Sequence, residues 1–159
     1  MTICNLYVLY SALSGGQRIM GLDIGKKTIG LALGDPDHKV ASPFRILWRR
    51  KFTLDAQELI SDIAEHNIGA LILGWPLSMD GTAGPVCDSV RDFAHAFLRL
   101  HDIPVCFHDE RLSTKAVEAA MLEADLSRAR RAEKRDALAA SWILQSAFDL
   151  LKNDSLETN

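Results

Sequence analysis

Residues 19–34 read IMGLDIGKKTIGLALG, and this stretch decides the fold that we predict. It consists of two apolar runs separated by a turn at residues 25–27. Because neither run alternates regularly with polar residues, the two predict adjacent strands that are covered on both faces. Asp23 stands inside the first run, where a carboxylate is unfavourable unless a cation or hydrogen-bond donors meet it. Our hypothesis is that Asp23 meets a metal ion; the alternative is a turn residue next to the strand.

Composition and charge narrow the class of protein. The 159 residues, 48% apolar and 25% charged, predict one globular domain with a substantial core. The formal net charge of −3 argues against a protein that coats nucleic acid through its overall charge. Cys4, Cys87 and Cys106 have no CxxC spacing, so we expect reduced thiols in the cytoplasm rather than a disulfide or a zinc site.

The ends of the chain differ from its centre. Residues 3–13 are fairly apolar, but they lack the charged start of a signal peptide and are too short to span a bilayer. We therefore expect residues 1–17 to form an extension outside the core fold, or to follow a start codon assigned upstream of the true one near Met20. The domain then covers residues 18–152, and residues 153–159 form a flexible tail.

The order of predicted elements is strand, strand, strand, helix, strand, helix, strand, helix, helix. A β-meander that leads into β-α-β units gives an α/β fold with a mixed five-stranded sheet and helices on both faces. Between the last two helices, residues 127–135 are polar and basic, and we expect them to be mobile. The final helix is expected to begin at Asp136.

Acidic residues occupy three separated places: Asp23 in the first strand, Asp109 or Glu110 at the end of the last strand, and Asp136 at the start of the last helix. If the fold brings them together, their oxygen ligands suit Mg²⁺ or Mn²⁺, and paired ions are the usual device for phosphodiester hydrolysis. Other roles stay open. Asp136 is well placed to interact with a helix dipole, and Asp109 or Glu110 can form an ion pair with Arg111.

Basic residues flank two of these acids. Lys26 and Lys27 follow Asp23, and the run at residues 128–135 precedes Asp136. Such charge is what a phosphate backbone needs, although a solvated charged loop is the alternative. The loop at residues 74–82 follows the carboxyl end of a predicted strand, where open α/β sheets bind ligands.

Four motifs occur together in this order: LDIGKKTIG at residues 22–30, GWPLSMDGT at 74–82, DERLST at 109–114, and DALAA at 136–140 with Ile143 and Leu144. On these motifs the chain from about Arg18 to Leu151 resembles the YqgF family, also called RuvX, of pre-16S rRNA nucleases and Holliday-junction-resolvase-like proteins. The resemblance implies an RNase H-like fold, in agreement with the predicted order of elements.

The resemblance also implies roles for individual residues. Asp23, Glu110 and Asp136 would be the catalytic acids that hold Mg²⁺ or Mn²⁺, with Asp109 in reserve. The residues that would bind the substrate are Lys26, Lys27, Asp80, Gly81, Thr82, Arg111, Arg131 and Arg135. Thr28 departs from the family, which usually has Arg at this position.

The function that the resemblance implies is metal-dependent cleavage at the 5′ end of the 16S rRNA precursor in the bacterial cytoplasm. The partners would be precursor RNA and a ribosomal precursor particle, without a membrane, and the protein would be a monomer or homodimer. Two alternatives stay open: resolution of branched DNA, which requires a dimer because two symmetric strands are nicked, and a non-catalytic RNA-binding assembly factor.

Overall fold

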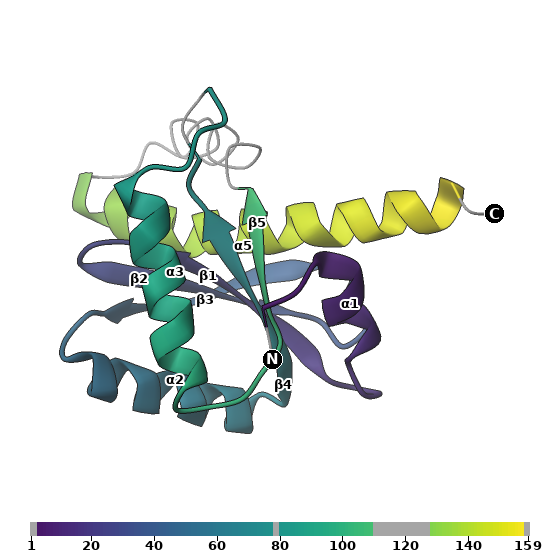
Figure 1. The fold of residues 1–159 in the computed structure, drawn as a ribbon, viewed down its shortest axis with the longest axis horizontal. Helices are drawn as coiled ribbons and strands as arrows, with labels where there is room; N and C mark the ends of the chain where they lie inside the picture. Colours follow the sequence, from purple (N-terminus) through teal and green to yellow (C-terminus); the bar gives the residue numbers. More distant parts are fainter. Residues whose placement is uncertain (1–2, 78–79, 110–127, 158–159) are drawn as a thin grey trace.

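The structure is a computed structural model that describes residues 3–77, 80–109 and 128–157, with side chains of the last range described over 137–153. Four helices and five strands lie in these ranges (Figure 1). Their order and bounds are α1 (Leu6–Ser11), β1 (Arg18–Ile24), β2 (Thr28–Gly34), β3 (Ala41–Trp48), α2 (Phe52–Glu65), β4 (Ile68–Trp75), α3 (Pro85–Leu98), β5 (Val105–Asp109) and α5 (Arg128–Glu157).

The strands form one mixed sheet, as predicted, and their order in it is β3-β2-β1-β4-β5. Short turns join β1, β2 and β3, so these three strands pair antiparallel. The helices α2 and α3 carry the chain back across the sheet, so β4 pairs parallel to β1 and β5 pairs parallel to β4. The hairpin of residues 19–34 thus supplies β1, the central strand, and its neighbour β2.

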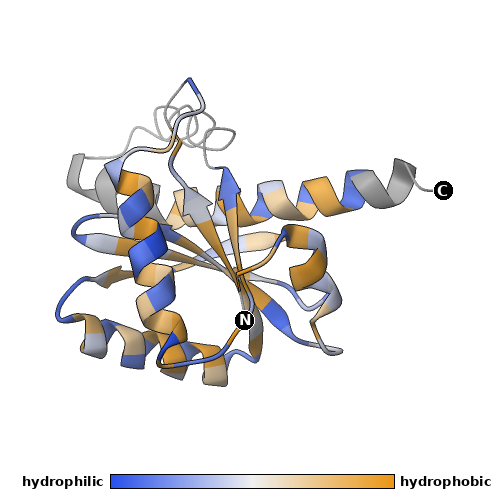
Figure 2. Ribbon diagram, viewed as in Figure 1, coloured by the Kyte–Doolittle hydropathy of each residue, from blue (hydrophilic) through white to orange (hydrophobic). Residues whose placement is uncertain are grey.

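The sheet has a helical layer on each face (Figure 1). Along β1, Met20, Leu22 and Ile24 belong to the core cluster beneath α2 and α3. The intervening Ile19 belongs to a second cluster, which includes Ala140 and Leu144 of α5. Figure 2 shows hydrophobic and hydrophilic residues interspersed along α2, α3 and the coloured part of α5. Burial on both faces therefore explains why the two strands lack polar alternation.

The helix α5 begins earlier and ends later than predicted. Residues 128–135, expected to be a mobile loop, form its first turns, because Arg, Ala, Glu and Lys are all strong helix formers. The helix also continues to Glu157, although a tail was expected from Asn153. Within the described ranges no helix, including this one of 30 residues, is both long and apolar enough to cross a membrane.

The segment before β1 packs against the domain. Its helix α1 contributes Leu6 and Leu9, whose residues are 6% and 0% exposed, to the core cluster beneath α5. The backbone N–H of Cys4 donates to the carbonyl oxygen of Val105 at 2.8 Å, which adds a short parallel bridge to the edge of β5. Residues 1–17 were expected to form an extension outside the core fold, but α1 within this segment completes one end of the core.

Candidate active site

Asp23 faces the side of the sheet that α5 covers. It lies two residues after Gly21 in β1, and alternate strand residues share a face. A Cβ on Gly21 would lie 2.9 Å from the carbonyl oxygen of Ala140 and 3.0 Å from the Cβ of Leu144. Gly21 therefore points at α5, and Asp23 points to the same side. Asp23 is partly exposed, although both residues beside it in the strand are buried.

Glycines stand on both sides of Asp23 in the sheet. On one side Asp23 pairs with Gly30 of β2. On the other side Leu22 pairs with Leu73 of β4, so the next position in the parallel register sets Gly74 beside Asp23. Neither neighbour has a side chain, and both are buried in the sheet.

The backbone of Asp136 lies at the level of Asp23. The helix α5 runs antiparallel to β1, because Ala140 meets Gly21 while Phe148 meets Gly34 beside Ile19. Asp136 precedes Ala140 by four helical residues, about 6 Å, and Asp23 follows Gly21 by two strand residues, about 6.6 Å. The two steps are nearly equal and point in the same direction, so the backbones of these two acids, 113 positions apart, lie at a similar level along β1 and α5.

The third predicted acid follows β5. Asp109, the last residue of this strand, pairs with Trp75 and shares the face of Phe107. Phe107 packs on the core cluster beneath α2 and α3, so Asp109 lies on the face opposite Asp23. Glu110 lies outside the described residues. By strand alternation Asp109 is therefore the weaker candidate of the two.

The predicted substrate-binding residues that the structure describes lie in the loops that follow the carboxyl ends of β1 and β4. Lys26 and Lys27 are exposed in the β1–β2 turn. Beyond β4, the Asp80 carboxylate accepts hydrogen bonds from the N–H and Oγ1 of Thr82, at 3.0 and 2.7 Å. Gly81, between them, has a φ of 88°, which favours glycine. Arg111 and the side chains of Arg131 and Arg135 lie outside what the structure describes.

His108 shares the face of Asp23 and lies two strands away, about 10 Å across the sheet. Its Nε2 lies 3.0 Å from the Oγ of Ser146 on α5, so this pair ties β5 to the helix that contains Asp136. Burial lowers the pKa of His108, and the nearby Asp109 carboxylate opposes that effect. Sequence reasoning missed Ser146 and the glycine neighbours of Asp23, because both depend on strand register.

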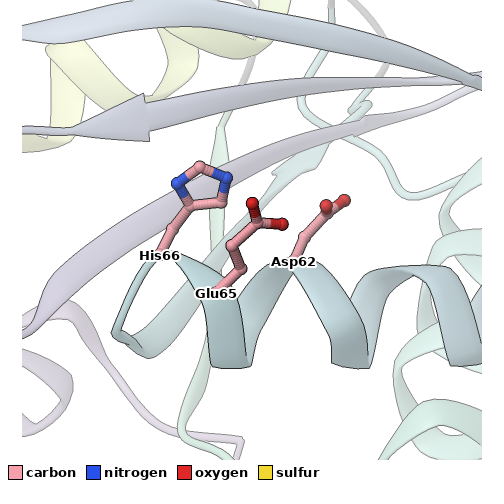
Figure 3. Close-up of side chains that lie close together, drawn as sticks. All are labelled: Asp62, Glu65 and His66. Atoms are coloured by element: carbon pink, nitrogen blue, oxygen red, sulfur yellow. The ribbon is translucent and has the colours of Figure 1, made fainter.

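A second group of possible ligands lies on α2 (Figure 3). One ligand atom each from Asp62, Glu65 and His66 can be chosen so that all three lie within 4.8 Å of one another. However, the guanidinium of Arg45 donates to the Asp62 carboxylate from Nη2 at 2.5 Å and from Nε at 3.2 Å. The His66 ring packs edge-on against Phe44. This group lies under the other face of the sheet from Asp23, and an ion pair already satisfies one of its acids.

Sequence comparison places this architecture among known proteins. The model of the RuvX family, described as Holliday junction resolvase, matches residues 17–150. A protein of Paramagnetospirillum magneticum named "Putative pre-16S rRNA nuclease" is 51% identical over 141 residues, which are 89% of this chain and 91% of that protein. A protein of Rhodospirillum centenum with the same name is 47% identical over 157 residues, 96% of this chain and 84% of that protein.

Solved structures share the fold at low sequence identity. Thermus thermophilus RuvC in complex with a Holliday junction substrate superposes with a TM-score of 0.56 at 15% identity, over 86% of this chain and 96% of that chain. Fowlpox virus resolvase with Holliday junction DNA gives 0.52 at 13% identity, over 85% of this chain and 99% of that chain. These likenesses confirm the expected RNase H-like fold.

Proposed function

Because this chain belongs to the RuvX family, we propose that it is a nuclease that cleaves phosphodiester bonds at the 5′ end of pre-16S rRNA. Relatives named for that RNA are 43% to 51% identical and match nearly the whole chain. The observation that carries the proposal is the level shared by Asp23 in β1 and the backbone of Asp136 in α5. A nuclease needs acids that converge there, and a domain that only binds RNA does not.

We infer that Asp23, Glu110 and Asp136 hold Mg²⁺ or Mn²⁺. Carboxylate oxygens are the hard ligands that these ions prefer, and Gly30 and Gly74, which flank Asp23 in the sheet, have no side chains of their own. When bound, such ions supply an activated water and neutralise charge on the leaving oxygen. Asp109 belongs to the face opposite Asp23, so we assign the third ligand to Glu110 rather than to Asp109.

The remaining predicted residues would hold the substrate. Lys26 and Lys27 extend from the turn next to Asp23 and would attract the phosphates on either side of the scissile bond. The loop of residues 80–82 and Arg111 would contact the strand beyond the ends of β4 and β5. Arg131 and Arg135 belong to the turns of α5 just before Asp136, where positive charge would draw the RNA backbone toward the acids.

The proposal extends to where the protein works. Three free cysteines fit a reducing compartment, and we place the protein in the bacterial cytoplasm. There its substrate would be precursor RNA, alone or within a ribosomal precursor particle. The nuclease domain of residues 18–152 would work together with α1, whose Leu6 and Leu9 belong to its core.

A second candidate function is resolution of branched DNA. It is favoured by the description of the matching family and by the fold shared with RuvC. A resolvase must nick two symmetric strands, so it would act as a dimer with paired sites. Selective paired nicking of four-way junctions would favour this function over the first.

The experiment compares cleavage of a labelled pre-16S RNA fragment and a labelled four-way junction in Mn²⁺. We expect RNA cleavage by the wild type, and Asp23→Asn should lose more than the ~10–100-fold typical of outer-shell partners of a metal. Asp102→Asn is the matched control, since it removes the same charge from an exposed residue before the start of β5. Cleavage that survives Asp23→Asn but requires Mn²⁺ would contradict the proposed site.

A further inference from the structure

We propose that Arg49 is a positioning residue that holds the β1–β2 turn, residues 25–27, in the form that presents Lys26 and Lys27 beside Asp23. This inference rests on the proposed function, because it assigns Arg49 a role in substrate binding at the same site. Arg49 directly follows β3. This strand pairs with β2, which begins just after the turn.

Two hydrogen bonds join Arg49 to the turn. Its backbone N–H donates to the carbonyl oxygen of Lys27 at 2.8 Å, and its Nη1 donates to the carbonyl oxygen of Gly25 at 2.7 Å. The turn is closed internally by the N–H of Gly25, which donates to the carbonyl oxygen of Thr28 at 2.9 Å. Arg49 therefore grips both ends of the turn, and the guanidinium bond is charge-assisted.

The other side of the guanidinium is anchored to α3. Its Cζ lies 5.8 Å from the centre of the Phe93 ring, within the range of a cation–π interaction. A rigid planar guanidinium can donate to a carbonyl at its edge while it stacks on a ring, which a lysine ammonium cannot reproduce. Arg49 thus links the turn to a helix of the opposite layer.

The surroundings of Arg49 do not suit a phosphate. The hollow next to its side chain is also lined by Asp88 and Asp92 from α3, and both acids are exposed. A phosphate in this hollow would meet two carboxylates of its own sign. The guanidinium is therefore built to hold the protein backbone, and the task of meeting phosphates falls to Lys26 and Lys27.

The consequence is a turn that is fixed before substrate arrives. Gly25 is only two residues beyond Asp23, so the bond to its carbonyl fixes the chain at the exit from the site. If the turn were loose, each binding event would have to order Lys26 and Lys27, and this ordering would weaken substrate binding. Loss of Arg49 should therefore appear in KM more than in kcat.

The test compares Arg49→Met and Arg49→Lys with Arg50→Met. Arg50 is the matched control, because it removes the same charge one residue away, and its guanidinium bonds to Glu58 rather than to the turn. In Arg49→Met we expect amide hydrogen exchange at Gly25 to be about tenfold faster, the size expected when a charge-assisted bond is lost. KM for the pre-16S RNA fragment should rise about as much, and kcat should stay close to that of the wild type. Arg49→Lys should give intermediate exchange, and Arg50→Met should leave it unchanged.

Two results would overturn the proposal. One is unchanged exchange at Gly25 in Arg49→Met. The other is an equal fall in the salt dependence of RNA binding for Arg49→Met and Arg50→Met without a difference in exchange, which would make Arg49 a simple phosphate contact. If the wild type cleaves neither RNA nor junctions, the proposed function fails. The exchange comparison still tests whether Arg49 holds the β1–β2 turn. If Arg49→Met does not fold, Arg49→Lys provides the same comparison.

Discussion

A Cβ placed on Gly21 would lie 2.9 Å from the carbonyl oxygen of Ala140. At this point β1 and α5 are so close that only the hydrogen of a glycine fits between them. This contact sets how closely the helix approaches the strand. It also sets the level at which Asp136 lies opposite Asp23, because both acids are reached by short, fixed steps from it. A close contact between backbones is thus adjacent to the candidate site.

Gly21→Ala should therefore destabilise the protein and disturb the site. The added methyl group meets backbone and cannot be absorbed by a rotamer change, so we expect a loss of ~1–3 kcal/mol, typical of overpacking. For a chain of this size Tm should fall by about 2–4 °C per kcal/mol. Mn²⁺ affinity should fall as α5 moves away. Gly15→Ala is the control, because a Cβ there meets no other residue within 4 Å; equal Tm values for the two variants would contradict the expected close contact.

Leu9→Ala tests whether the N-terminal segment belongs to the core. Leu9 is fully buried beneath α5, so we expect a loss of ~2–5 kcal/mol in the free energy of unfolding. Val8, its neighbour in α1, is 50% exposed, and Val8→Ala should stay within about 0.5 kcal/mol. Urea denaturation of the two variants measures the difference. A neutral Leu9→Ala would mean that α1 is detached in solution.

The strands and the place of Asp23 could be predicted because the apolar runs on either side of the 25–27 turn require burial on both faces. The early start of α5 could not, since a run such as RARRAEKR at residues 128–135 reads equally well as a solvated loop and as an exposed helical end. What decides between these two readings is tertiary packing of the later turns, which extends the helix backward from Ala140.

The neighbours of Asp23 were also hidden from the sequence. Gly30 and Gly74 matter because strand register puts them beside the carboxylate, and register comes from pairing between strands rather than from local pattern. The same register places Asp109 on the face of the sheet opposite Asp23. Two neighbouring positions in a strand face opposite sides of the sheet, and the sequence alone does not show which side each faces.

Stability should fall as the pH drops below about 6.5, in part because of His38. Burial lowers the pKa of His38 from its ordinary 6.5, and the carboxylates of Asp35 and Asp37 offset only part of this effect. The unfolded chain therefore binds more protons between the lowered pKa and 6.5, so the free energy of unfolding rises with pH in that window and levels off above it.

His38→Asn isolates this contribution. His38 has a φ of 57°, a left-handed conformation that Asn tolerates well, so the backbone should be preserved. We expect a shallower loss of Tm between pH 7 and pH 5 than in the wild type, measured by thermal unfolding. Some pH dependence should remain, because burial lowers the pKa of His108 in the same direction. An identical slope in wild type and variant would show that His38 is protonated as easily in the folded chain as in the unfolded one.

Mn²⁺ binding distinguishes the site at Asp23 from the acidic group on α2. Glu65→Gln should bind Mn²⁺ with the affinity of the wild type, since Arg45 already neutralises the neighbouring Asp62 and an ion there would have to displace it. Asp23→Asn should weaken binding, because it removes one of the three ligands that we propose for a hard cation. Titration followed by the electron paramagnetic resonance of free Mn²⁺ measures both variants without reference to cleavage. The reverse pattern, with loss in Glu65→Gln and retention in Asp23→Asn, would move the metal to the other face of the sheet and leave Asp23 without its proposed role.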